Sequence, residues 1–167
     1  MKKLTLSAAA VLLLCSHAYA QSQTEITGNV ASKCTIYTDR AGVYGNPLPD
    51  TLTTATADGG TPAVIRYDVV NANNYKAVIT TPVSFSTSPS LSDTLAWTGS
   101  VEVHQVSDAQ QSGYDNSKRV FDNTTEIDLT VAGSVWFKAN SSVTYGVNKA
   151  LPGGVYKAIV TAECIAL

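Results

Sequence analysis

The stretch LPGGVYKAIVTAECIAL, residues 151–167, constrains the fold more sharply than any other part of the sequence. Its first four residues are typical of a turn, and the rest alternates as a β-strand does. By this period, Tyr156, Val160 and Cys164 face one way, and Val155, Ile159 and Ile165 face the other. A strand that is apolar on both faces needs cover on both, yet no further strand follows it here. A complete sandwich would normally supply one more strand to cover this edge.

The rest of the chain also favours strands and shows no convincing apolar period of 3.6 residues. Thr, Val, Ser and Tyr are abundant, and these residues favour strands and turns. Strands are predicted within residues 24–38, 63–71, 75–81, 95–107, 126–139 and 155–167, and a long ordered loop at 39–62. By period 2, one side of 63–71 carries Ile65, Tyr67 and Val69, and the apolar side of 126–139 carries Ile127, Leu129, Val131, Val135 and Phe137. Six or seven short strands separated by turns predict a single all-β domain, an immunoglobulin-like β-sandwich.

Residues 1–20 have the features of a secretory signal peptide. A basic start precedes an apolar run over residues 8–15, which is too short for a retained transmembrane helix. Ala18-Tyr19-Ala20 is a small-x-small cleavage site followed by Gln21. Cleavage between Ala20 and Gln21 would leave residues 21–167, enough for one domain with a sizeable core.

The charge of the chain limits the classes of partner. Its 13 acidic residues outnumber its 11 basic ones, and two of the basic ones, Lys2 and Lys3, would leave with the signal peptide. A mildly acidic chain without a basic cluster argues against nucleic acid or anionic lipid as a partner.

The cysteines predict one disulfide. Cys15 would leave with the signal peptide, so Cys34 and Cys164 would remain in the exported chain. Because such a chain meets an oxidising compartment, these two residues are expected to join the start of the domain to its last strand. The alternative is a pair of buried free thiols.

The sequence offers little catalytic chemistry. His104 is the only histidine after residue 20, and it lies on a predicted strand. No metal-ligand spacing, nucleophile elbow or phosphate loop is present, and the acidic residues are scattered. We therefore expect no enzyme activity, no metal and no cofactor.

The segment before Cys34 carries a short alternating row of its own, formed by Ile26, Gly28 and Val30. Such a segment is suited to leave its own domain and pair with the open sheet edge of another subunit. Backbone hydrogen bonds would give that pairing affinity, and pockets for alternate side chains would give it specificity. Glycine in the row would allow a close approach of the two backbones.

Several stretches, taken in order, resemble the pilins of the chaperone–usher pathway, including the archaic branch similar to spore coat protein U. They are ITGNVASKCTI (26–36), VIRYDVVNANNYKAVI (64–79), DLTVAGSVWF (128–137) and LPGGVYKAIVTAEC (151–164). The resemblance covers most of residues 21–167, and the order of the stretches carries it.

The resemblance implies an incomplete immunoglobulin-like fold whose missing strand leaves a groove between the first and last strands. A periplasmic chaperone would fill the groove first, and at an outer-membrane usher the N-terminal extension of the next subunit would replace it. Thr24, Ile26, Gly28 and Val30 would be the donor row, within an extension over residues 21–31. Val155, Ile159 and Ile165, or instead Tyr156 and Val160, would line the acceptor groove, and the period alone leaves the face open.

The function implied is that of a structural fimbrial subunit, exported through the periplasm to a fimbrium on the cell surface, which supports adhesion or biofilm formation. The chain departs from many pilins in two ways. Their early cysteine pairs with one in the second strand or its hairpin, whereas Val69 and Val70 occupy that region here. In addition, only residues 21–33 precede Cys34 once the signal peptide is removed.

The alternative function is that of a self-complete secreted β-sandwich that binds a protein or carbohydrate ligand. Exposed aromatic side chains often mark such recognition surfaces, and Tyr114, Trp97 and Trp136 are the candidates. Trp97 is expected in the core, and Trp136 is expected to be the more exposed.

Overall fold

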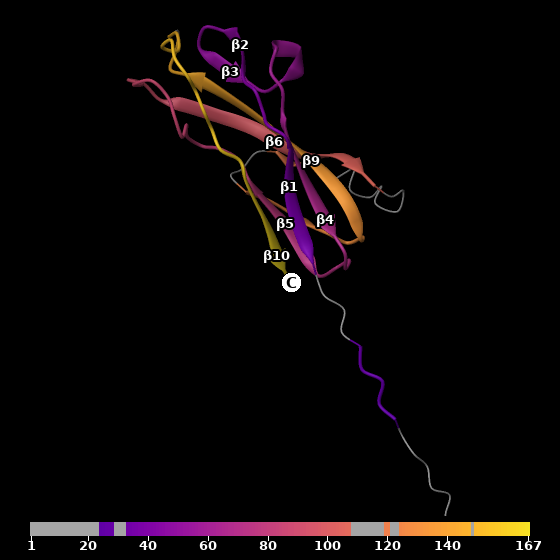
Figure 1. Ribbon diagram of the computed structural model, residues 1–167. Coiled ribbons are helices and arrows are strands. Elements are labelled where there is room, and N and C mark those ends of the chain that lie inside the picture. The colour runs from indigo at the N-terminus through magenta and orange to yellow at the C-terminus, as the bar shows by residue number, and fades with distance from the viewer. Residues whose placement is uncertain (1–23, 29–32, 108–118, 121–123, 148) are drawn as a thin grey trace, which may run out of the picture. The chain divides into compact units, whose positions relative to one another are not determined.

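The computed structural model describes residues 24–28, 33–107, 119–120, 124–147 and 149–167 (Figure 1). The chain divides into two units, residues 1–30 and 31–167, and every strand belongs to the second. Residues 24–28, in the first unit, lie in no helix or strand. Within the described ranges, no helix is long and apolar enough to cross a membrane.

The larger of two antiparallel sheets is built around the long strand β9 (Gly133–Tyr145). One edge of β9 pairs with β6 (Leu95–Val106), and the other edge pairs first with β4 (Ala63–Val69) and then with β3 (Thr51–Thr53). The remaining members of this sheet are outer strands: β1 (Cys34–Arg40) on β4, β2 (Gly45–Leu48) on β3, and β7 (Arg119–Val120) on β6.

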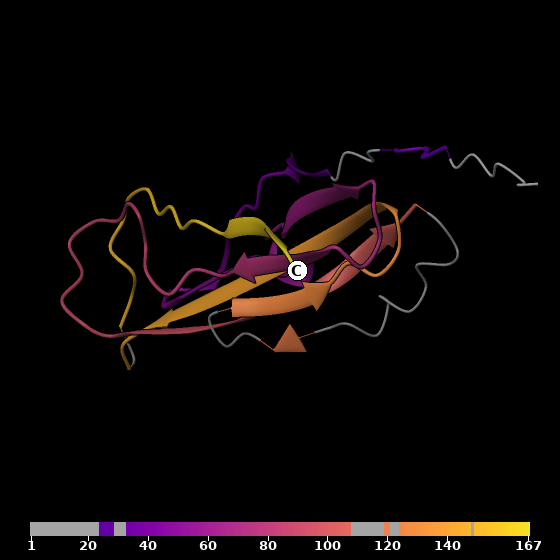
Figure 2. The same ribbon diagram turned by 90° about the horizontal axis from the view of Figure 1, so that it is seen from below.

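The smaller sheet has β5 (Tyr75–Thr80) at its centre, with β10 (Thr161–Ala166) on one side and β8 (Thr124–Asp128) on the other. Figure 2 shows the yellow β10 beside the magenta β5. The two sheets pack together, which confirms the predicted all-β sandwich-like architecture.

Side chains of both sheets meet in one core. Tyr67 and Phe137 come from the larger sheet, are completely buried, and pack edge to face with ring centroids 5.5 Å apart. Ile79 and Leu129, also completely buried, come from β5 and the residue after β8. The predicted row Ile65, Tyr67 and Val69 on β4 is buried, and so are Ile127, Leu129, Val135 and Phe137 of the second predicted row. Val131, which also belongs to the second row, is only half-buried.

The stretch 126–139, predicted as one strand, is instead two strands in different sheets. β8 ends at Asp128, and β9 begins at Gly133, whose φ of 129° lies in a region that L side chains rarely adopt. The chain therefore crosses from one sheet to the other within a few residues. Because both strands face the same core, their apolar residues keep one alternation across the crossing.

Other boundaries differ as well. Residues 39–62, predicted as a loop, contain β2, β3 and a short 3-10 turn at Thr56–Asp58. The Asn46 side-chain amide ties the β2–β3 hairpin together, because it donates to the carbonyl groups of Leu48 and Thr51 at 2.6 and 2.7 Å. The last strand begins only at Thr161, and residues before it form a single isolated bridge, between Lys157 and Thr87.

Candidate functional site: a groove between two open sheet edges

Two edge strands, one from each sheet, lie together on one side of the sandwich. Within the described residues, β1 pairs only with β4, and β10 pairs only with β5. The predicted disulfide between Cys34 and Cys164 joins them, with a Cα–Cα distance of 6.4 Å. Each strand therefore turns one row of backbone N–H and C=O groups toward a space that no described strand occupies.

A cleft of about 300 Å³ opens beyond the disulfide, between the segment that runs on from β1 and the residues that precede β10. Thr38, Ala41 and Tyr44 form one wall, and Ala158, Ile159 and Val160 form the other. Its floor comes from β4 and β9, through Ala63, Ile65, Ala139 and Ser141. Many of these side chains are small, so the cleft has room for a bulky apolar group.

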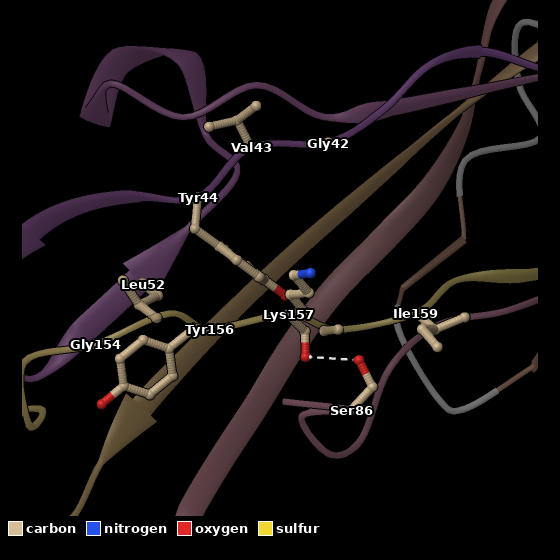
Figure 3. Close-up of a pocket in the computed structure, with 10 residues that line it drawn as sticks. Gly42, Val43, Tyr44, Leu52, Ser86, Gly154, Tyr156, Lys157 and Ile159 are labelled. Atoms are coloured by element: carbon tan, nitrogen blue, oxygen red, sulfur yellow. Dashed lines mark hydrogen bonds between the residues drawn. The ribbon is translucent and has the colours of Figure 1, made fainter. Parts of the chain in front are cut away.

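A second cleft of about 580 Å³ continues the first and shares Gly42, Tyr44, Ala158 and Ile159 with it (Figure 3). It extends the space as far as Gly154 and Tyr156. We call the two clefts together the groove. On its far wall, the Ser86 hydroxyl donates to the Lys157 carbonyl at 3.1 Å, the dashed line in Figure 3.

Burial alternates along residues 155–165 and separates the two rows proposed for the acceptor groove. Tyr156 and Val160 are half-buried, and Val160 packs against the core. Val155, Ile159 and Ile165 belong to the outer row, with 64%, 62% and 47% of their surface exposed. Ile159 nevertheless borders both clefts, whereas Val155 and Ile165 line neither.

An aromatic cluster lies at the wider end of the groove. The Phe85 ring packs edge to face against Trp97 and Tyr156, with centroids 4.9 and 5.0 Å away, and lies 6.4 Å from the Tyr44 ring. The Tyr156 hydroxyl donates to the Pro152 carbonyl at 2.6 Å. The sequence analysis selected neither Phe85 nor Tyr44 as a site residue. Phe85 could have been found, because it is the one aromatic residue in the polar stretch 83–94.

Tyr44 connects this cluster to the floor of the groove. Its hydroxyl lies 2.9 Å from the Ser141 Oγ atom of β9, within hydrogen-bonding distance. Burial raises the pKa of Tyr44, and the hydrogen bond to Ser141 opposes that effect. The Tyr44 side chain is therefore uncharged at physiological pH, and it lines the groove with its ring while its hydroxyl contacts Ser141.

Trp136 was predicted to be more exposed than Trp97, and both side chains are half-buried. Trp136 lies on the outer face of the larger sheet, where its indole N–H donates to the Asp39 carboxylate. The Arg66 guanidinium carbon lies 5.9 Å from its ring centroid and 4.4 Å from that of Tyr37. These contacts cross three strands, so Trp136 serves to hold the sheet together.

The proposed donor row is described only in part. Thr24, Ile26 and Gly28 are exposed, and Ile26 keeps 94% of its surface accessible. Val30, the cleavage site at Ala20 and Gln21, and Tyr114 lie outside the described residues. Among the described side chains, no three of His, Cys, Asp and Glu converge as metal ligands.

No protein-family model matches the chain, and no curated protein or solved structure does either.

Proposed function

We propose that this protein is a structural fimbrial subunit of the chaperone–usher type, which polymerises by strand addition. The groove of one copy would accept the N-terminal extension of the next, and the added strand would complete an immunoglobulin-like sandwich. One observation carries this proposal: beyond the disulfide that links β1 to β10, residues 38–44 and residues 154–160 face each other across a groove that no described strand fills. Open edges of this kind favour pairing with another chain.

The lengths of the groove and of the donor row agree. The wall from Gly154 to Val160 comprises seven residues, which span about 20 Å in an extended chain. The row from Thr24 to Val30 also comprises seven residues. If residues 24–30 are extended, the four residues of the donor row share the face that would turn toward the groove. The polar residues Glu25 and Thr27 lie on the opposite face, toward water.

Side-chain volume supports the same pairing. Ile26 is the bulkiest residue of the donor row, and the first cleft is lined largely by small residues, with alanine at positions 41, 63, 139 and 158. Full burial of an isoleucine side chain contributes about 1.5–3 kcal/mol. Ile26 is therefore the residue whose loss would weaken the pairing most.

This function would need the partners that the resemblance implies. A periplasmic chaperone would cover the groove before assembly, and an outer-membrane usher would bring successive subunits together. The protein would then be an extracellular fimbrial component without catalytic activity, and it would support surface adhesion or biofilm formation.

Two substitutions on opposite faces of the extension test the proposal. In protein purified from an oxidising compartment, wild type and Thr27→Asp should form concentration-dependent oligomers by light scattering, because residue 27 faces water. Ile26→Asp should give monomers, since its carboxylate would enter an apolar cleft. If all three proteins are equally stable monomers at every concentration, the domain is self-complete and the alternative, a secreted binding domain, replaces this proposal.

A further inference from the structure

We infer that the Cys34–Cys164 disulfide is a stop that closes one end of the groove and limits how far an added strand can run. This inference rests on the proposed function, because it concerns the same groove and the same occupant. It assigns the disulfide a role in choosing the length and register of the added strand, besides its role in stability.

The distance between the two edges carries the inference. A strand inserted between β1 and β10 would hold them about 9.5 Å apart, twice the spacing of neighbouring strands. Two packed sheets, whose facing side chains fill the space between them, lie about 10 Å apart. At the disulfide the Cα atoms are only 6.4 Å apart. Neither a backbone nor an inward-pointing side chain of an added strand fits at that level.

The residues next to the disulfide that point toward the core show where the room for an added strand begins. Next to the disulfide, Ile36 and Ala162 pack against the core cluster, so the space between the edges is filled there too. Two residues further from the disulfide, Thr38 of β1 and Val160, which directly precedes β10, line the first cleft. The added strand would thus run from the level of Thr38 and Val160 toward Gly154, and would end before the disulfide.

A stop of this kind makes the groove selective for length. Residues that extend the added strand past Thr38 and Val160 have no backbone partner and must turn away into solvent. One end of the strand is thereby fixed in position, so its alternate side chains meet the clefts in a single register.

Peptides of increasing length test the stop. The acceptor is the chain of residues 21–167 with the substitution Ile26→Asp. Because this substitution should prevent the extension of one copy from binding another copy, the groove of the acceptor would be empty. The probes are peptides of residues 24–30, 21–30 and 24–33, which lengthen the donor at either end. Each is titrated against the acceptor with the disulfide intact and against the same acceptor with Cys34→Ser and Cys164→Ser, both confirmed as folded by circular dichroism.

One of the two longer peptides adds residues at the end that meets the disulfide. We expect that peptide to bind the disulfide-bonded acceptor with an affinity within about twofold of that of the peptide 24–30. In the serine variant, the same extension should gain about tenfold, since further backbone hydrogen bonds that contribute about 1.4 kcal/mol in all become available. A tenfold gain in both acceptors, or in neither, overturns the inference and leaves the proposed function standing. If no peptide binds either acceptor, the proposed function fails and the inference fails with it.

Hydrogen exchange on the disulfide-bonded acceptor gives a second measurement that does not depend on the serine variant. The bound peptide of residues 24–30 should slow exchange in residues 38–44 and 154–160. Exchange in residues 33–36 and 164–167 should stay unchanged. Slower exchange in these latter segments would show that the strand passes the disulfide, and would overturn the inference.

Discussion

The hydroxyl group of Tyr67, on β4 of the larger sheet, is shared between the backbone carbonyl groups of Glu163 and Val78 in the smaller sheet, at 3.2 and 3.4 Å. Tyr67 is completely buried, and its ring packs against Phe137. Because Glu163 belongs to β10, this side chain ties β10, the strand that directly follows the groove wall at residues 154–160, to the opposite sheet.

Tyr67→Phe keeps the ring and removes this polar link. We expect the free energy of unfolding to fall by about 1 kcal/mol, the usual net contribution of such a hydrogen bond. Tyr37→Phe is a matched control, because the Tyr37 ring lies exposed under Arg66 and would be retained. Urea unfolding of both variants measures the difference, and equal midpoints would show that the Tyr67 hydroxyl contributes nothing.

Alkaline pH should weaken the fold through the same residue. Burial, with a smaller contribution from the Glu163 charge, raises the pKa of Tyr67 well above its ordinary value of about 10. Above pH 10 the unfolded chain releases a proton that the folded chain retains, so the stabilisation present below pH 10 is lost as the pH rises. One such group contributes a slope of up to about 1.4 kcal/mol per pH unit. Unfolding of wild type between pH 9 and 11 should therefore be steeper in pH than that of Tyr67→Phe, and parallel curves would contradict this assignment.

Loss of the disulfide should be costly. It links residues 130 positions apart, and a closed loop of that length contributes about 5 kcal/mol in the chain-entropy model. Cys34→Ala with Cys164→Ala should therefore lower the free energy of unfolding by several kcal/mol. Wild type treated with a reductant should approach the same value in urea unfolding. A loss below about 1 kcal/mol would mean that the disulfide contributes little to the stability of the fold.

Gly99 should not tolerate a side chain. It pairs with Ser141 between β6 and β9, and a Cβ atom there would lie 2.2 Å from the Asn140 carbonyl oxygen. Gly99→Ala should cost about 1–3 kcal/mol, because one of the two long strands must shift. Gly153→Ala is the control, since nothing lies within 4 Å of its Cβ position. Thermal unfolding should separate the two variants, and equal midpoints would contradict the close approach.

The sequence was sufficient to predict the parts of the fold that depend on alternation and covalent chemistry. The β-strand content, the buried row Ile65, Tyr67 and Val69, and the disulfide followed from period 2 and from cysteine number. These features are local, or they involve only two residues, so the sequence pattern contains them.

Other features depended on long-range geometry that no local pattern carries. The crossing between β8 and β9 was hidden because both strands turn apolar residues toward one core. The face of the last segment that borders the groove depends on how β10 pairs with β5, and the aromatic wall depends on where the loop containing Phe85 lies. The short distance between the two sheets at Cys34 and Cys164 likewise depends on how the sheets pack.

The proposed assembly places Ile26 of one copy in the groove of another. The most direct test replaces Ile26 with a diazirine-bearing aliphatic amino acid and activates it in a mixture of ¹⁴N- and ¹⁵N-labelled chains. Mass spectrometry then identifies the residues joined and shows whether they come from one chain or two. The account predicts cross-links between chains, to residues 38–44 and 158–160. Cross-links confined to single chains, or to surfaces away from these residues, would contradict it.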